Sequence, residues 1–171
     1  MTPLLENAGE ADFPAIASLN VESYREFTEY ITPESWALMS GNISKPERIA
    51  ERATFIVAKV DGVLAGSVAY CPAGKSVDPI PAEWASILLL AVSPLFRGRG
   101  IGELLAKECV RRASLDGAAV MGLFTSERML SAQRIYEKLG FVRGSEIPMR
   151  LGMRYYRYRL DLGAASIPTA E

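Results

Sequence analysis

Residues 87–102 decide how this chain folds, and they read ILLLAVSPLFRGRGIG. The apolar run at residues 84–92, broken only by Ser86, predicts a strand that is covered on both faces. A turn with glycines at positions 98, 100 and 102 follows, and apolar residues at helical spacing then predict an amphipathic helix over residues 100–116. A buried strand therefore passes through a glycine-rich turn directly into a helix.

This turn has the features of an anion-binding site. Glycines let the backbone approach a ligand closely, and the free N–H groups at a helix start favour negative charge. Arg97 and Arg99 add positive charge. The turn indicates a phosphate or pyrophosphate ligand; the alternative is a surface turn with two solvated arginines. Glu103 stands where a dinucleotide fingerprint needs its third glycine, and the turn holds no Gly-Lys-Ser/Thr, so two common nucleotide motifs are excluded.

The remaining elements extend outward from this stretch. The first fifty residues are predicted to be mostly helical, with Thr32 capping one helix. A second predicted helix over residues 129–139 ends at Gly140. Strands are predicted at residues 54–60, 63–70, 119–125, 141–150 and 153–162. This order predicts a mixed α/β (α+β) domain with a central sheet over residues 1–162, followed by a flexible tail at residues 163–171.

Composition excludes several classes of function. Lys and Arg number 19 and Asp and Glu number 20, so the net charge of −1 argues against a nucleic-acid or membrane-surface partner. The chain has no histidine, which excludes a Ser-His-Asp triad and a zinc site with imidazole ligands, and no metal is expected. Two cysteines, Cys71 and Cys109, make no disulfide framework. We expect a cytoplasmic protein, since no signal peptide or membrane-spanning run is found.

Two segments together resemble a known family. Arg97-x-x-Gly100-x-Gly102 after Leu90-Ala91-Val92 is similar to the acyl-CoA signature of the GNAT N-acetyltransferases. Residues 132–141, AQRIYEKLGF, are similar to that family's A-x-x-x-Y-x-K-x-G-F segment. The resemblance extends over about residues 3–162. It implies a GNAT-like central sheet, mixed but mostly antiparallel, with one splayed pair of strands and with helices on its faces.

The resemblance also implies an activity: an acetyl-CoA-dependent N-acetyltransferase in which a primary amine of a small molecule or peptide attacks the acetyl group directly. Pantetheine is expected to pair with the backbone of Leu90, Ala91 and Val92. Tyr136 is expected to protonate the departing thiolate, although its helical spacing alone would favour a core aromatic residue. The pyrophosphate is expected to lie against Arg97, Gly98, Arg99, Gly100, Ile101 and Gly102.

The general base is less well defined. Many family members carry a carboxylate six residues before the position of Val92, where this chain has Ser86. Ser86 and the nearby Glu83 are therefore candidates for passing the proton to ordered water. Many members also carry an asparagine where this chain has Met129. These departures keep open an alternative function, a non-catalytic acyl-CoA-binding sensor or regulatory module.

The acceptor amine is predicted from residues 20–30, which join the first two helices. Glu22, Glu26 and Glu29 recur at spacings of four and three, so on one helix they would share a face. Such a face would bind a cationic amine, with Tyr24, Phe27 or Tyr30 packing on it; the alternative is a solvated helix face. The sequence does not determine the acceptor, the length of the acyl chain or the oligomeric state, and a homodimer is one of the states left open.

Overall fold

The computed structural model describes residues 2–163, so most of the predicted tail, residues 164–171, lies outside the described part of the chain. The strands are β1 (Leu4–Asn7), β2 (Thr54–Val60), β3 (Val63–Cys71), β4 (Ala85–Val92), β5 (Val120–Ser126), β6 (Val142–Arg150) and β7 (Met153–Asp161). The α-helices are α1 (Phe13–Tyr24), α2 (Pro33–Ile43), α3 (Pro46–Ile49), α4 (Ile101–Leu115) and α5 (Leu130–Lys138). Short 3-10 helices are η1 (Glu10–Asp12), η2 (Arg25–Tyr30) and η3 (Pro94–Phe96). Among the described residues, no helix is both long enough and apolar enough to cross a membrane.

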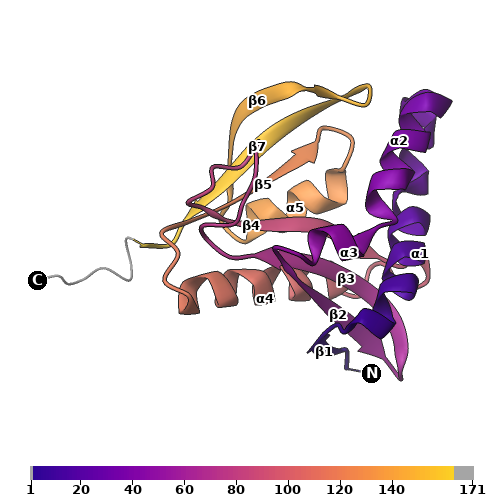
Figure 1. Ribbon diagram of the computed structural model, residues 1–171, viewed down its shortest axis with the longest axis horizontal. Coiled ribbons are helices and arrows are strands. Elements are labelled where there is room, and N and C mark those ends of the chain that lie inside the picture. Colours follow the sequence, from indigo (N-terminus) through magenta and orange to yellow (C-terminus); the bar gives the residue numbers. More distant parts are fainter. Residues whose placement is uncertain (1, 164–171) are drawn as a thin grey trace, which may run out of the picture.

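One seven-stranded sheet runs through the molecule in the order β1-β2-β3-β4-β5-β7-β6 (Figure 1). Every neighbouring pair is antiparallel except β4 and β5. These two strands pair in parallel at only two positions, Ala85 with Met121 and Ser86 with Gly122, and then part. The mixed, mostly antiparallel sheet with a splayed pair of strands is therefore confirmed.

A bulge bends β4 just where the two strands part. The register between β3 and β4 shifts after Ser67, and Leu89 adopts a left-handed conformation with φ of +54°. A bulge of this kind turns the strand and leaves backbone groups unpaired. The edge of β4 beyond Ser86 is consequently not paired with β5.

Helices cover both faces of the sheet. On one face, α4 and α5 pack on the main apolar cluster, which includes Ile56, Val68, Met121 and Leu123. On the other face, α1 packs through Ile16 on a smaller cluster. A third cluster joins α2 to the β6–β7 hairpin, and the tip of this hairpin reaches toward α2 in the upper part of Figure 1. The parted end of β4 and β5 lies between these helical layers.

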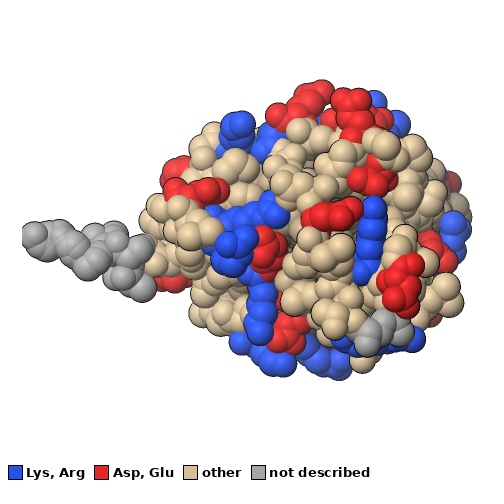
Figure 2. All heavy atoms as spheres, turned by 90° about the horizontal axis from the view of Figure 1, so that it is seen from below, with Lys and Arg blue, Asp and Glu red and all other residues tan. Residues whose placement is uncertain are grey.

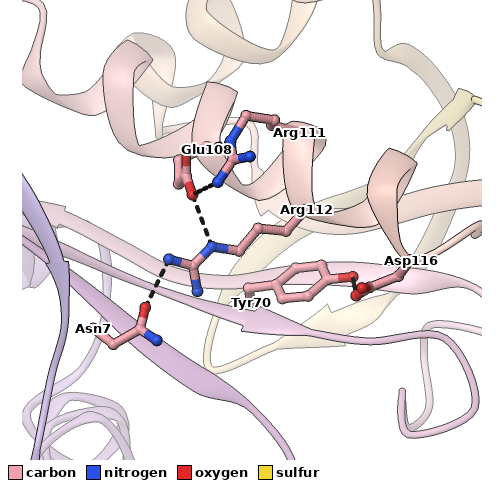
Figure 3. Close-up of polar contacts among 6 residues, drawn as sticks. All are labelled: Asn7, Tyr70, Glu108, Arg111, Arg112 and Asp116. Carbon is pink, nitrogen blue, oxygen red and sulfur yellow. Dashed lines mark hydrogen bonds and ion pairs between the residues drawn. The ribbon is translucent and has the colours of Figure 1, made fainter.

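Polar contacts fix α4 against the far end of the sheet (Figure 3). The Glu108 carboxylate accepts from Arg111 at 2.7 Å and from Arg112 at 2.8 Å, and Arg112 also donates to the Asn7 side chain in β1 at 2.6 Å. Tyr70 of β3 donates its hydroxyl hydrogen bond to Asp116 at 2.6 Å. On the side that is lowest in Figure 1, basic and acidic side chains are interspersed rather than gathered by sign (Figure 2). The hydrogen bonds of Glu108, Arg112 and Tyr70 hold α4 in place, and the first turn of α4 follows the glycine-rich segment.

Most predicted elements agree with the structure to within a residue or two, and Thr32 caps α2 by accepting from the Ser35 N–H at 3.1 Å. One prediction is wrong. The helix α1 ends at Tyr24, and the chain continues as the 3-10 helix η2, so Glu22, Glu26 and Glu29 do not share one α-helical face. A 3-10 helix has about three residues per turn, which keeps Glu26 and Glu29 aligned but not Glu22.

Candidate active site

A cleft of about 570 Å³ opens where β4 and β5 part. Two groups of residues line it, one on the side of the glycine-rich turn and one on the side of η2. The first group includes Gly98, Gly100, Ile101, Gly102, Glu103, Leu130, Ser131, Ala132, Arg134 and Ile135. The second includes Ser23, Tyr24, Glu26, Phe27, Leu89, Phe124, Thr125, Arg128 and Met129. Leu90, Val92, Arg97 and Tyr136 also line the cleft.

The glycine-rich turn presents bare backbone to the cleft. Gly98 and Gly100 have φ values of +79° and +78°, and a Cβ atom at either position would meet nothing within 4 Å. Gly100 is the residue before α4, and no side chain caps the N–H groups of the helix there. A helix start without a cap is a site where an anion is stabilised. The turn thus keeps the donors that a pyrophosphate needs.

Gly102 is glycine for a different reason. A Cβ atom at this position would lie 2.9 Å from Ile135 Cδ1 of α5. Its small size therefore lets α4 and α5 approach each other beside the cleft, rather than opening space for a ligand. The salt bridge of Glu103 with Lys138, at 3.0 Å, joins the same two helices and is the main cause of the lowered pKa of Glu103.

The two arginines of the turn differ in placement. Arg97 lines the cleft, and its guanidinium donates to the Glu26 carboxylate at 3.2 Å and to the Ser23 carbonyl at 3.1 Å. Arg99 is not among the lining residues, and its guanidinium lies 5.3 Å from the Phe96 ring centre. Arg97 consequently ties the turn to the end of α1.

The β4 wall contains a contact that the sequence did not reveal. Leu90 and Val92 line the cleft, whereas the side chain of Ala91 is buried on the other side of the strand. The Tyr24 hydroxyl donates to the Leu90 carbonyl at 3.1 Å, and burial is the main cause of its raised pKa. Tyr24 belongs to no motif, so only the packing of α1 beside β4 identifies it.

Tyr136 lies on α5 with its ring held on several sides. The ring packs edge-on against Phe141 at 5.7 Å and is tilted against Tyr158 at 6.4 Å. Its side chain is buried, and its hydroxyl makes no hydrogen bond within residues 2–163 while the residue lines the cleft. Burial first, and then the neighbouring Tyr24, raise its pKa. The hydroxyl therefore keeps its proton and has a free donor beside the cleft.

The two candidates for the base lie elsewhere. Ser86 is buried, and its hydroxyl is 2.8 Å from that of Ser76 in the loop before β4. Side chains alternate along a strand, so Ser86 points away from the face of its neighbour Ile87, which does line the cleft. Glu83 is exposed in the same loop. The structure does not bring either residue together with Tyr136.

Of the three glutamates predicted to bind the acceptor, only Glu26 lines the cleft, and it is paired with Arg97. Glu22 and Glu29 are exposed outside it. Residues that the sequence did not single out as a site also line the cleft, among them Phe124 and Arg128. They come from the end of β5 and the turn after it, and no local pattern marks them.

Comparison with known proteins agrees with this architecture. The model of the Acetyltransferase (GNAT) family matches residues 13–141, and the chain therefore belongs to this family of acetyltransferases. An uncharacterized N-acetyltransferase of Methanocaldococcus jannaschii is 28% identical over 141 residues, which are 82% of this chain and 61% of that protein. The N-acetylaspartate synthetase of Rattus norvegicus is 31% identical over 122 residues, covering 63% and 39% of the two chains. The chain thus spans less than two thirds of the length of either relative.

Solved structures share the fold at low sequence identity. A proposed acetyltransferase of Salmonella typhimurium, solved with its cofactor acetyl-CoA, has a TM-score of 0.72 and 18% identity over the full length of both chains. The PaiA N-acetyltransferase of Thermoplasma acidophilum, in complex with coenzyme A, has a TM-score of 0.71 and 16% identity, covering 92% of this chain and 98% of that one. At these identities the likeness establishes the fold alone.

Proposed function

We propose that this protein is an acetyl-CoA-dependent N-acetyltransferase that acts on a primary amine, and that residues 1–162 form its single catalytic domain. The observation that carries this proposal is one cleft that contains both an uncapped helix start, at Gly100, and the free hydroxyl of buried Tyr136. The uncapped helix start suits a pyrophosphate, and the tyrosine hydroxyl suits a departing thiolate. Two buried free thiols, Cys71 and Cys109, are in keeping with a cytoplasmic location.

The cofactor fits the residues present. Pyrophosphate would accept from the backbone N–H groups of residues 97–102, with Arg134 nearby on the same side of the cleft. Pantetheine would pair with the edge of β4 at residues 90–92, which β5 leaves unpaired. The two structural neighbours that hold acetyl-CoA and coenzyme A support this assignment.

The transfer itself is a direct attack. The amine nitrogen bonds to the acetyl carbonyl carbon as the carbon–sulfur bond breaks, and the Tyr136 hydroxyl gives its proton to the sulfur. A thiol has a pKa of about 8.5, so modest help from an acid is sufficient. The phenolate then regains a proton from water, and the new amide loses one to water.

Water is the proposed route for the amine proton. The carboxylates that line the cleft are Glu26 and Glu103, and both are engaged in salt bridges. Ser86 and Glu83 have no part in the proposal because neither lines the cleft. The reaction therefore draws on the neutral fraction of the amine, and kcat/KM is expected to rise with pH toward the pKa of the acceptor.

The test is a screen of amines with acetyl-CoA, with thiol release and product mass as the two readouts. We expect acetylation of at least one class among amino acids, polyamines, aminoglycosides and peptide N-termini. Tight binding of acetyl-CoA without turnover of any amine would contradict the proposal and would instead indicate a non-catalytic acyl-CoA-binding module. Absence of acetyl-CoA binding would contradict both functions.

A further inference from the structure

The charges that line the cleft are unequally compensated. Glu26 is paired with Arg97, and Glu103 is paired with Lys138 and Lys107. Arg128 lines the cleft on the η2 side but has no carboxylate within 4.0 Å among residues 2–163. The acceptor side of the cleft thus has an uncompensated positive charge and no uncompensated negative one.

Arg128 is held in a way that leaves its donors available. Its guanidinium lies 4.5 Å from the centre of the Tyr30 ring of η2. Arg150, at the end of β6, lies 5.1 Å from the centre of the Phe124 ring but does not itself line the cleft. Stacking occupies the flat face of a guanidinium, whereas its N–H groups point outward along the edge and match a carboxylate in bidentate geometry.

The same side of the cleft also has apolar walls, beside the polar residues Ser23, Glu26 and Thr125. Phe27, Leu89, Phe124 and Met129 line it between Tyr24 and Arg128. Apolar and aromatic walls with a few placed polar groups are typical of small-molecule sites. The apolar walls suit the apolar part of a small substrate, and the arginine suits an anionic group attached to that part.

We propose that the acceptor is a small amine that carries a carboxylate, or an equally compact anion, on an apolar body, and that Arg128 binds this anion. This inference rests on the proposed function and specifies its substrate class. A nearby positive charge lowers the pKa of an amine, so Arg128 also favours the neutral amine that attacks. Amino acids with apolar side chains meet this description.

The first experiment compares matched acceptors. Each of the apolar amino acids is offered beside its carboxamide, its decarboxylated amine and its aminophosphonate analogue, with acetyl-CoA saturating. After correction for the neutral fraction of each amine, we expect kcat/KM for the carboxylate to exceed that for the two uncharged analogues by about tenfold or more, as for a charge-assisted hydrogen bond. Comparable rates with the aminophosphonate would assign the site to compact anions generally, and lower rates would assign it to carboxylates.

The second experiment uses variants. Arg128→Gln is expected to raise KM for the best carboxylate acceptor about tenfold or more, while leaving its uncharged analogue and the Kd of acetyl-CoA unchanged. Arg25→Gln is the matched control, because Arg25 also lies over an aromatic ring, that of Trp36 at 5.9 Å, but does not line the cleft. Circular dichroism melting checks that both variants fold.

Three results would overturn the inference. The first is a best acceptor without an anionic group, such as a polyamine. The second is an equal loss with Arg128→Gln for charged and uncharged acceptors, which indicates a structural role. The third is binding of acetyl-CoA without acetylation of any carboxylate-bearing amine. Failure to bind acetyl-CoA at all would instead contradict the proposed function.

Discussion

Tyr136 is the residue on which the proposed chemistry depends most. Phe141 and Tyr158 hold its ring, its backbone carbonyl accepts from the Phe141 N–H at 3.0 Å, and its hydroxyl is left without a partner in residues 2–163. The Tyr136 hydroxyl oxygen is not among the buried polar atoms that lack a partner, so it is open to the cleft although the ring is buried. Packing thus fixes the ring, while a ligand in the cleft can reach the hydroxyl.

Replacing Tyr136 by Phe removes the hydroxyl and keeps the packed ring. We expect kcat to fall roughly 10- to 1000-fold, the range typical of one general acid, with acetyl-CoA affinity nearly unchanged. Burial holds the pKa of Tyr136 above its usual value of 10, so its ionisation should not reduce the parent rate below that pH. Single-turnover kinetics and calorimetry provide the two readouts. An unchanged chemical rate would leave Tyr136 as a core residue only.

At the scale of elements, α4 connects the stability of the fold to the cofactor site. Arg111 and Arg112 hold the pKa of Glu108 at about 2, against an ordinary value of 4.5. The carboxylate is only 15% exposed, so the shift corresponds to at most about 3 kcal/mol of stability, less after solvent screening. A lowered folded-state pKa contributes stability above pH 4.5, and that stability is lost as pH falls toward 2.

Glu108→Gln should therefore lower the free energy of unfolding by about 1–3 kcal/mol at pH 7. The difference from the parent should shrink between pH 4.5 and 2, as Glu108 is protonated in the parent. Denaturant titrations at several pH values measure it. Glu51→Gln is the control, because Glu51 is exposed and makes no ion pair within residues 2–163. A difference that stays constant down to pH 2 would argue against this role of Glu108.

Elements with strong local signals could be predicted from the sequence, and the others could not. Asp61 and Gly62, a pair typical of a two-residue hairpin turn, both have positive φ between β2 and β3, and this turn and the apolar run of β4 determine their strands locally. The end of α1 has no comparable signal: the chain continues past Tyr24 as a 3-10 helix to Tyr30, and only Thr32 before Pro33 disfavours further helix. The bulge at Leu89 has no sequence mark, since leucine seldom adopts a positive φ.

At the scale of the whole molecule, the cleft results from the parting of two neighbouring strands. Its cofactor side comes from two short segments, residues 98–103 and 130–136, which match the motifs around Gly100 and Tyr136, so it could be predicted. Its acceptor side combines η2 with the end of β5 and the turn after it, and the β6–β7 hairpin packs against these elements; only the folded chain brings them together. Arg128 and Phe124 could not be predicted for this reason. From the sequence, Glu26 is a candidate for binding a cation, but the folded chain brings it next to Arg97, with which it pairs.

The central claim is that acetyl-CoA binds in this cleft against the glycine-rich turn, and calorimetric titration of acetyl-CoA into the parent, Gly100→Asp and Gly62→Asp tests it most directly. Gly100 and Gly62 have φ values of +78° and +80°, and a Cβ atom at either would meet nothing within 4 Å, so the two substitutions impose similar backbone strain. Only Gly100→Asp sets a carboxylate against a pyrophosphate. We predict binding by the parent and by Gly62→Asp with similar Kd, and at least about tenfold weaker binding by Gly100→Asp, the equivalent of 1.4 kcal/mol. Equal binding by all three proteins would contradict the claim.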